Sequence, residues 1–86
     1  MNTRVLRYEV PVDDQWHTHR LQGDIVHVAA RRPDVVEIWA EHHGNKTFEV
    51  ERRFRVFGTG HPADGVHIGT AIAAGGALVW HLREAL

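Results

Sequence analysis

Apolar and polar side chains alternate with a period of two along most of the chain, a pattern typical of β-strands with one covered face. Apolar residues at helical spacing are rare by comparison. The alternation predicts strands at 6–12, 16–21, 24–30, 35–42, 48–56, 66–72 and 78–82. Short strands that follow one another at intervals of about 8 to 12 residues are typical of a small antiparallel barrel or sandwich. The sequence therefore predicts an all-β fold of six to seven short strands.

Two of these segments carry more specific predictions. Segment 24–30 is apolar on both faces, which predicts a strand in the centre of a sheet. In segment 48–56, only Arg52 interrupts the apolar row. Its stem can pack in the core while its guanidinium reaches a carboxylate or the sheet edge. A bulge near Glu51 and Arg52 is the alternative.

Turn residues separate the predicted strands. The HHGN stretch at 42–45 is one predicted turn, and Gly75 with Gly76 predicts a hairpin between the last two strands. The C-terminal HLREAL also has helix-forming composition, so a short helical turn from Arg83 is the alternative to continued strand.

Length and charge limit the function classes. The 86 residues predict a single β domain, 1–86, with a thin core, and the absence of cysteine excludes disulfides and thiolate zinc sites. Ten basic and eleven acidic residues give a net charge of -1, so we expect no nucleic-acid partner. No apolar run is long enough to span a bilayer, which predicts a cytoplasmic protein without a membrane partner.

The GTGHP stretch that follows segment 48–56 has two interpretations. In the first, the glycines supply positive φ and the segment is a turn that ends a long strand. In the second, Gly58, Thr59, Gly60 and His61 form a ligand-binding loop, because closely spaced glycines can expose backbone N–H groups to an anion. Neither a following helix nor a lysine supports a phosphate site.

Eight histidines are an unusual excess for this length. His17 and His19 stand two apart on a predicted strand, so they share a face and are candidate metal ligands. Surface or interface positions are the alternative for these histidines, and no cofactor is predicted. The chain lacks serine and cysteine, and its threonines could act as nucleophiles only if paired with a base. The sequence therefore predicts a protein that is not an enzyme.

Three residues are predicted to form an interaction surface. The alternation of segment 35–42 places Trp39 with two glutamates outside the apolar row, where an exposed ring could anchor a protein contact. Burial under a second layer is the alternative for this ring. Arg53 and Arg55, on the polar face of segment 48–56, are the other predicted interface residues, although cross-strand ion pairs with Glu49 and Glu51 would also explain them.

The stretch RRFRVFGTGHP, followed by HIGT and LVWHL, resembles a family of small uncharacterised proteins of tailed bacteriophages and prophages. The opening RYEVPV and the following QWHTHRLQGDIVHVA resemble the start of that family. The shared positions would be Phe54, Gly58, Thr59, Gly60, His61, Gly69, Thr70, Trp80 and His81. The resemblance implies a phage-encoded accessory protein of the host cytoplasm, with no activity to transfer.

These observations predict a non-enzymatic, homo-oligomeric binding module that acts on a host or phage protein. The first alternative is a protein that binds a small ligand or nucleotide through the GTGH loop. A histidine-based metalloprotein is the second alternative.

Overall fold

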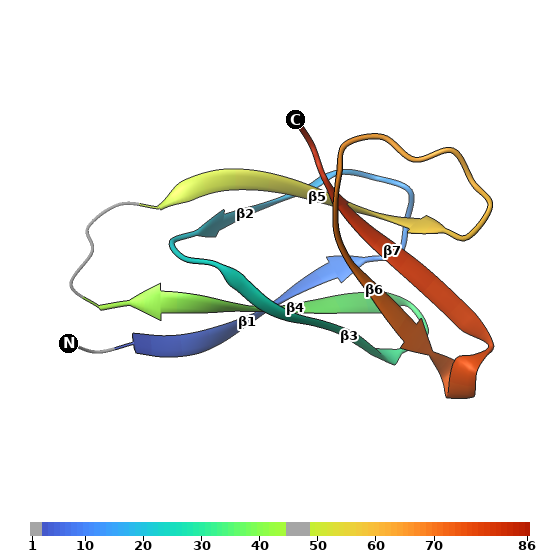
Figure 1. Cartoon of the computed structure of the whole chain (residues 1–86), viewed down its shortest axis with the longest axis horizontal. Coiled ribbons are helices and arrows are strands. Elements are labelled where there is room, and N and C mark those ends of the chain that lie inside the picture. Colours follow the sequence, from blue (N-terminus) through green and yellow to red (C-terminus); the bar gives the residue numbers. More distant parts are fainter. Residues whose placement is uncertain (1–2, 45–48) are drawn as a thin grey trace.

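The computed structural model describes residues 3–44 and 49–86, which form two antiparallel sheets (Figure 1). The strands are β1 (Thr3–Pro11), β2 (His17–Leu21), β3 (Ile25–Arg32), β4 (Val35–His43), β5 (Val50–Gly58), β6 (Val66–Ala73) and β7 (Leu78–Glu84). The first sheet has the order β1-β4-β3, and the second has the order β2-β5-β7-β6. The predicted all-β fold is confirmed, in the form of two sheets that do not close into one barrel.

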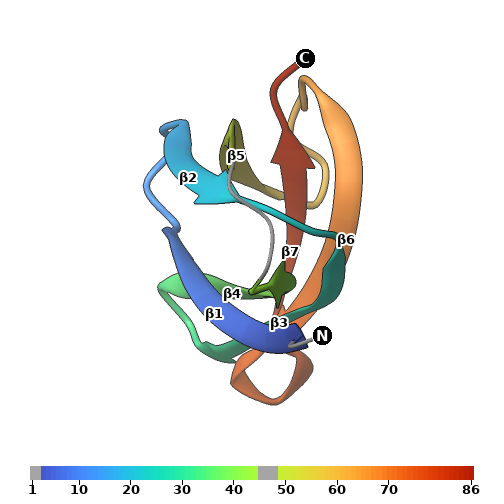
Figure 2. The same ribbon diagram turned by 90° about the vertical axis from the view of Figure 1, so that its left-hand side faces the viewer.

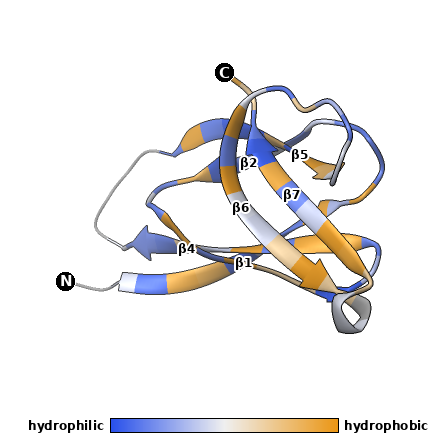
Figure 3. Ribbon diagram, turned by 45° about the vertical axis from the view of Figure 1, so that its right-hand side comes forward, coloured by the Kyte–Doolittle hydropathy of each residue, from blue (hydrophilic) through white to orange (hydrophobic). Residues whose placement is uncertain are grey.

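The core lies between the two sheets. Figure 2 looks along the first sheet and shows the second sheet arching over it. The buried cluster consists of Val10, Leu21, Ala30, Val36, Ile38, Ala40, Phe54, Val56, Ala71, Ala73 and Leu82. Bands of hydrophobic and hydrophilic residues alternate along the strands, as Figure 3 shows for β7, because successive side chains point to opposite faces.

β4 is the central strand of the first sheet and follows the predicted alternation. Val36, Ile38 and Ala40 are buried in the core, and Trp39 lies on the opposite face. β1 pairs with β4 in an unbroken register that places Arg7 beside Trp39 and Glu9 beside Glu37. This register brings charged residues of both strands together on the outer face.

β3 lies at an edge of the first sheet, so the prediction of a central strand is wrong. Its Val28 packs against Gly69 of β6, where an added Cβ would lie only 2.9 Å from Val28 Cγ2. Val26, at the register shift between Ile25 and His27, is 51% exposed. The apolar character of this segment therefore reflects packing against the second sheet and partial exposure, not a second paired neighbour.

Arg52 lies in the apolar row of β5, as predicted, and its guanidinium reaches a carboxylate. Its Nε and Nη2 atoms donate to the two carboxylate oxygens of Glu84 on β7, both at 2.7 Å. The guanidinium also lies 5.4 Å from the Phe54 ring centroid. The register between β2 and β5 is unbroken, so the alternative of a bulge at Glu51 and Arg52 is not observed.

β6 changes its buried face halfway along. A bulge between His67 and Gly69 shifts the register against β7, so that Ala71 and Ala73 are buried whereas Ile72 is 64% exposed. The predicted strand is confirmed, but its apolar residues do not form one continuous buried row. Ile68 packs against the core whereas Ile72 does not, and the sequence pattern does not mark the bulge next to which this change occurs.

The C-terminal region is a hairpin of β6 and β7. Gly75 and Gly76 have φ angles of 65° and 95°, which confirms the predicted turn. β7 continues to Glu84, so the alternative helical turn from Arg83 is wrong. Of the predicted HHGN turn and the start of segment 48–56, residues 45–48 lie outside the described residues. Within 3–44 and 49–86, no helix is long and apolar enough to cross a membrane.

Two glycines with nearly equal φ angles test how closely the loop after β5 packs. Gly60 and Gly65 have φ angles of 87° and 85°, but an added Cβ meets nothing at Gly60 and the Glu84 carbonyl oxygen at Gly65. We expect Gly60→Ala to cost about 1 to 2 kcal/mol in unfolding free energy and Gly65→Ala roughly 3 to 5 kcal/mol. Urea unfolding measures both values, and equal costs would contradict the close packing at Gly65.

Candidate functional site

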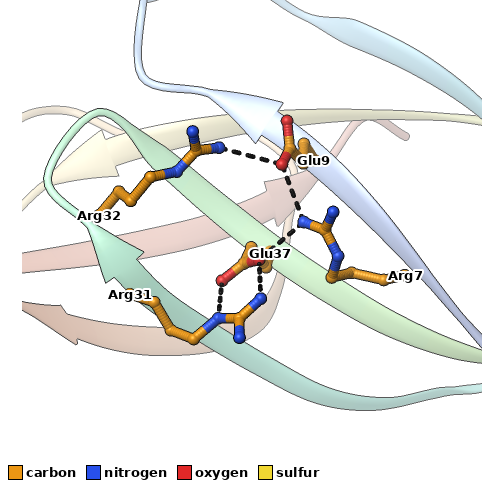
Figure 4. A pocket seen from close by; sticks show the side chains of 5 residues that line it. All are labelled: Arg7, Glu9, Arg31, Arg32 and Glu37. Carbon is orange, nitrogen blue, oxygen red and sulfur yellow. Dashed lines mark hydrogen bonds and ion pairs between the residues drawn. The ribbon is translucent and has the colours of Figure 1, made fainter.

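A group of five charged residues occupies the outer face of the first sheet. Its members are Arg7 and Glu9 of β1, Arg31 and Arg32 of β3, and Glu37 of β4, and we call them the arginine cluster (Figure 4). Glu9 and Glu37 are direct cross-strand neighbours, an arrangement that is unfavourable for two like charges. Arg7 offsets the repulsion between the two carboxylates, because its Nη1 donates to Glu9 Oε2 at 2.8 Å and to Glu37 Oε2 at 2.7 Å.

Glu37 is the buried centre of the arginine cluster. It is only 2% exposed although it points away from the core. Arg31 holds it in a bidentate pair, with Nε donating to Oε1 at 2.7 Å and Nη2 donating to Oε2 at 2.6 Å. Bidentate pairs of this kind are the strongest and most directional of protein ion pairs. One buried carboxylate therefore fixes two arginine side chains that are otherwise exposed.

The remaining arginine is held more loosely. Arg32 donates from Nη2 to Glu9 Oε2 at 3.0 Å, and the two side chains are 58% and 42% exposed. The five residues line a shallow depression of about 270 Å³. Three guanidinium groups against two carboxylates leave one net positive charge at this depression.

The arginines keep both carboxylates ionised. Hydrogen bonding from Arg31 lowers the pKa of Glu37 from 4.5 to about 2, with burial opposing the shift and Arg7 adding to it. The hydrogen bond from Arg7 lowers the pKa of Glu9. The same interactions with Glu37 raise the pKa of Arg31. The charge of the arginine cluster is therefore constant across the physiological pH range.

Trp39, a predicted interface residue, lies at the margin of the arginine cluster. Its ring centroid is 5.6 Å from Arg31 Cζ and 5.4 Å from the His27 ring, and the residue is half-buried. The arginine stacked on it belongs to the pair with Glu37. The outer position predicted for Trp39 is confirmed, and its role in an interface stays a prediction.

Arg53 and Arg55, the other predicted interface residues, lie on β5 in the second sheet and not beside Trp39. Arg55 lies over the Phe57 ring, 4.7 Å from its centroid. The glutamates predicted to pair with them contact Arg20 of β2 instead, at 3.7 Å for Glu49 and 3.1 Å for Glu51. The three predicted interface residues therefore do not form one surface.

The GTGHP segment ends β5 in a turn. The His61 backbone N–H donates to the Gly58 carbonyl at 3.2 Å, and Gly60 alone of the two glycines has a positive φ. The turn thus uses one of the N–H groups that an anion site would need. Gly58, Thr59 and His61 border a groove of about 450 Å³ together with residues 77–80. The ligand-binding role of this loop stays a prediction.

Thr59 is paired with a base, the condition under which a threonine could be a nucleophile. Its Oγ1 lies 2.7 Å from His81 Nε2, and His81 Nδ1 lies 3.4 Å from Thr70 Oγ1. In a nucleophile–base arrangement, a third group orients the base. Here that group is a distant hydroxyl, which cannot stabilise an imidazolium as a carboxylate would. The geometry therefore suits a structural hydrogen bond that joins the turn to β7.

The two histidines considered as metal ligands are already hydrogen-bonded. His17 Nε2 lies 2.7 Å from Asp13 Oδ1, and His19 Nε2 lies 2.7 Å from the Glu9 carbonyl oxygen. The described part of the chain contains no group of three or more histidine or carboxylate side chains arranged to hold a metal ion. A metal at His17 and His19 stays a prediction.

Sequence reasoning did not identify the arginine cluster. The alternation does place Arg7 and Glu9 on one face of the first strand and Glu37 outside the apolar row, which is the available signal. The register of β4 against both neighbours was needed to bring them together.

Fold and surface together define a small two-sheet β-domain with an ordered charged cluster on the outside of one sheet. The chain belongs to the family described as Domain of unknown function (DUF7352), whose model matches residues 1–85. No curated protein and no solved structure matches the chain. The phage origin implied by the sequence resemblance stays a prediction.

The pKa of Glu37 makes its contribution to stability depend on pH. Its pKa is about 2 when folded and about 4.5 when unfolded, so its stabilisation is complete above about pH 5 and disappears as the pH falls from 4.5 towards 2. We expect Glu37→Gln to cost about 1 to 3 kcal/mol in unfolding free energy at pH 7 and much less near pH 2.5. Urea unfolding of both proteins across this range measures the difference, in which the titration of other groups cancels. A difference independent of pH would contradict this role.

Proposed function

We propose that this protein is a non-enzymatic binding module that holds a partner protein on the outer face of its first sheet. The observation that carries the proposal is the burial of Glu37, which fixes the exposed side chains of Arg7 and Arg31 in one arrangement. Ordering a long side chain at an interface costs about 0.5 to 1.5 kcal/mol on binding. Because the folded chain already orders these arginines, they are suited to contact a partner at low entropic cost.

Trp39 supports the same assignment. Tryptophan and arginine are the residues that most often dominate the binding energy of protein interfaces, and here they are stacked on each other. The position of Arg31 over the ring helps to orient its guanidinium. We propose that Trp39 and Arg31 are the centre of the interface and that the rest of the arginine cluster sets its charge pattern.

The identity of the partner follows from the family resemblance and not from the geometry. A phage protein or a host protein is the partner that the resemblance implies.

Association with further copies of the chain is the other predicted contact, and light scattering of the purified protein at pH 7.5 measures it. No described contact favours the metalloprotein alternative over the binding module. The groove beside the GTGH loop keeps the small-ligand alternative in second place.

Capture experiments with matched baits test the proposal. The chain and its Trp39→Ala, Arg31→Gln and Arg53→Gln variants are immobilised and exposed to a lysate of the cells that carry the gene. We expect a partner whose affinity, measured by calorimetry after its purification, falls at least tenfold with Trp39→Ala and Arg31→Gln. Arg53→Gln removes a charge from the other sheet and should leave the affinity unchanged.

The same series can contradict the proposal. An affinity that falls only with Arg53→Gln would place the interface on the second sheet. Equal losses for Arg31→Gln and Arg53→Gln, with none for Trp39→Ala, would indicate general charge effects. Thermal unfolding of each bait separates a lost interface from a lost fold. A retained unfolding temperature is expected for Arg53→Gln, because surface substitutions usually change stability by less than about 0.5 kcal/mol. Arg31→Gln should unfold at a lower temperature, because it removes the bidentate partner of the buried Glu37, so its affinity is measured at a temperature at which the variant is folded.

A further inference from the structure

We infer that the arginine cluster recognises a carboxylate from an acidic segment of the partner. This inference rests on the proposed function and names the chemistry that the surface selects. Its first support is the supply of hydrogen-bond donors. Arg31 uses Nε and Nη2 on Glu37, Arg7 uses only Nη1, and Arg32 uses only Nη2. Among the described residues, no acceptor is bonded to the other guanidinium nitrogens.

The second support is the lining of the depression. All five residues that line it are charged, and the arginine side chains are 42% to 66% exposed. An anion in the depression would meet the remaining N–H groups of these arginines. The volume of about 270 Å³ lies just below the usual range of small-molecule pockets, about 300 to 1,000 Å³. It suits the end of one side chain better than a whole ligand.

The third support is the charge balance, which favours a singly charged group. The arginine cluster carries one net positive charge, and Glu9 and Glu37 both stay ionised, with pKa values below the ordinary range. A carboxylate would neutralise the surplus. A phosphate would add further negative charge close to two fixed carboxylates. The net charge of -1 on the whole chain also gives no long-range attraction to a polyanion.

The fourth support is the position of Trp39 next to Arg31. A guanidinium that is stacked on an aromatic ring and paired on one edge keeps its orientation when a second carboxylate approaches. The half-buried ring offers an apolar surface beside the depression. The preferred segment is therefore an acidic residue next to an apolar one.

A peptide titration followed by NMR tests the inference. The probes are the blocked peptide Leu-Glu-Leu-Glu, its counterpart with glutamine in place of glutamate, and its counterpart with phosphoserine in place of glutamate. We expect the glutamate peptide to shift the Arg31 Nε–H and Trp39 indole signals. The glutamine peptide should bind at least tenfold more weakly, since a charged hydrogen bond is lost. The phosphoserine peptide should also bind more weakly than the glutamate peptide.

Two variants with the same charge change separate a site from general electrostatics. Arg32 and Arg20 are both 58% exposed and both contact glutamates, but Arg20 lies on the second sheet. We expect Arg32→Gln to weaken glutamate-peptide binding about tenfold and Arg20→Gln to leave it unchanged. Equal effects would overturn the inference.

Glu37→Gln gives the sharpest distinction. The substitution makes the arginine cluster more positive, so simple attraction predicts tighter binding of the acidic peptide. We expect binding about fivefold to tenfold weaker, because Arg7 and Arg31 lose the carboxylate that orders them. Far-ultraviolet circular dichroism at neutral pH verifies the fold of this variant, and Arg32→Gln carries the test if the fold is lost. Tighter binding in a folded variant would overturn the inference.

The remaining outcomes are also decisive. Equal binding of the glutamine peptide excludes carboxylate recognition, and tighter binding of the phosphoserine peptide assigns the surface to phosphate instead. If partner capture depends on Trp39 and Arg31 but the glutamate peptide does not bind, the inference fails while the proposed function stands. If the peptide binds but capture does not depend on these residues, the proposed function fails.

Discussion

The thinness of the core is the constraint on which the rest of the structure depends. A chain of 86 residues folded as two sheets has one layer of inward side chains from each sheet, and Ile38, Phe54 and Leu82 are among its fully buried members. Every strand therefore has one face that the core does not cover. The side chains on those outer faces determine where the protein can contact a partner.

The outer face of the first sheet is covered by charge in place of a third layer. Glu37 is as inaccessible as the core residues, and its carboxylate is held by the guanidinium groups of Arg7 and Arg31. A buried carboxylate is costly unless cations and hydrogen bonds compensate, so Arg7 and Arg31 are bound to their places. The resulting surface is rigid, polar and stable in charge, which is the physical basis of the proposed binding role.

The sequence pattern predicted the strands and their inward residues well where the ladder is regular. The alternation around Val36 and the carboxylate partner of Arg52 were both confirmed. It failed where long-range geometry decides. β3 is an edge strand whose Val28 packs against Gly69 of the second sheet, and Ile72 is exposed in a strand that contains a bulge. The arginine cluster joins residues of three strands. The alternation does not predict which strands pair, so it placed the individual residues on outer faces but did not bring them together.

The strand order of the second sheet has a kinetic consequence. In residues 3–44 and 49–86, β3 with β4 and β6 with β7 are the only paired strands that follow each other along the chain. β5 lies between β2 and β7 and pairs with both across long separations. Closing such long loops lowers the conformational entropy of the chain before the hydrogen bonds and side-chain contacts of the sheet have formed to compensate. The hairpins can form early, but the sheet is complete only when β5 has found two distant partners. Until then its aromatic residues are exposed to water. The pairings of β5, together with that of β1 with β4, therefore give the fold a high contact order.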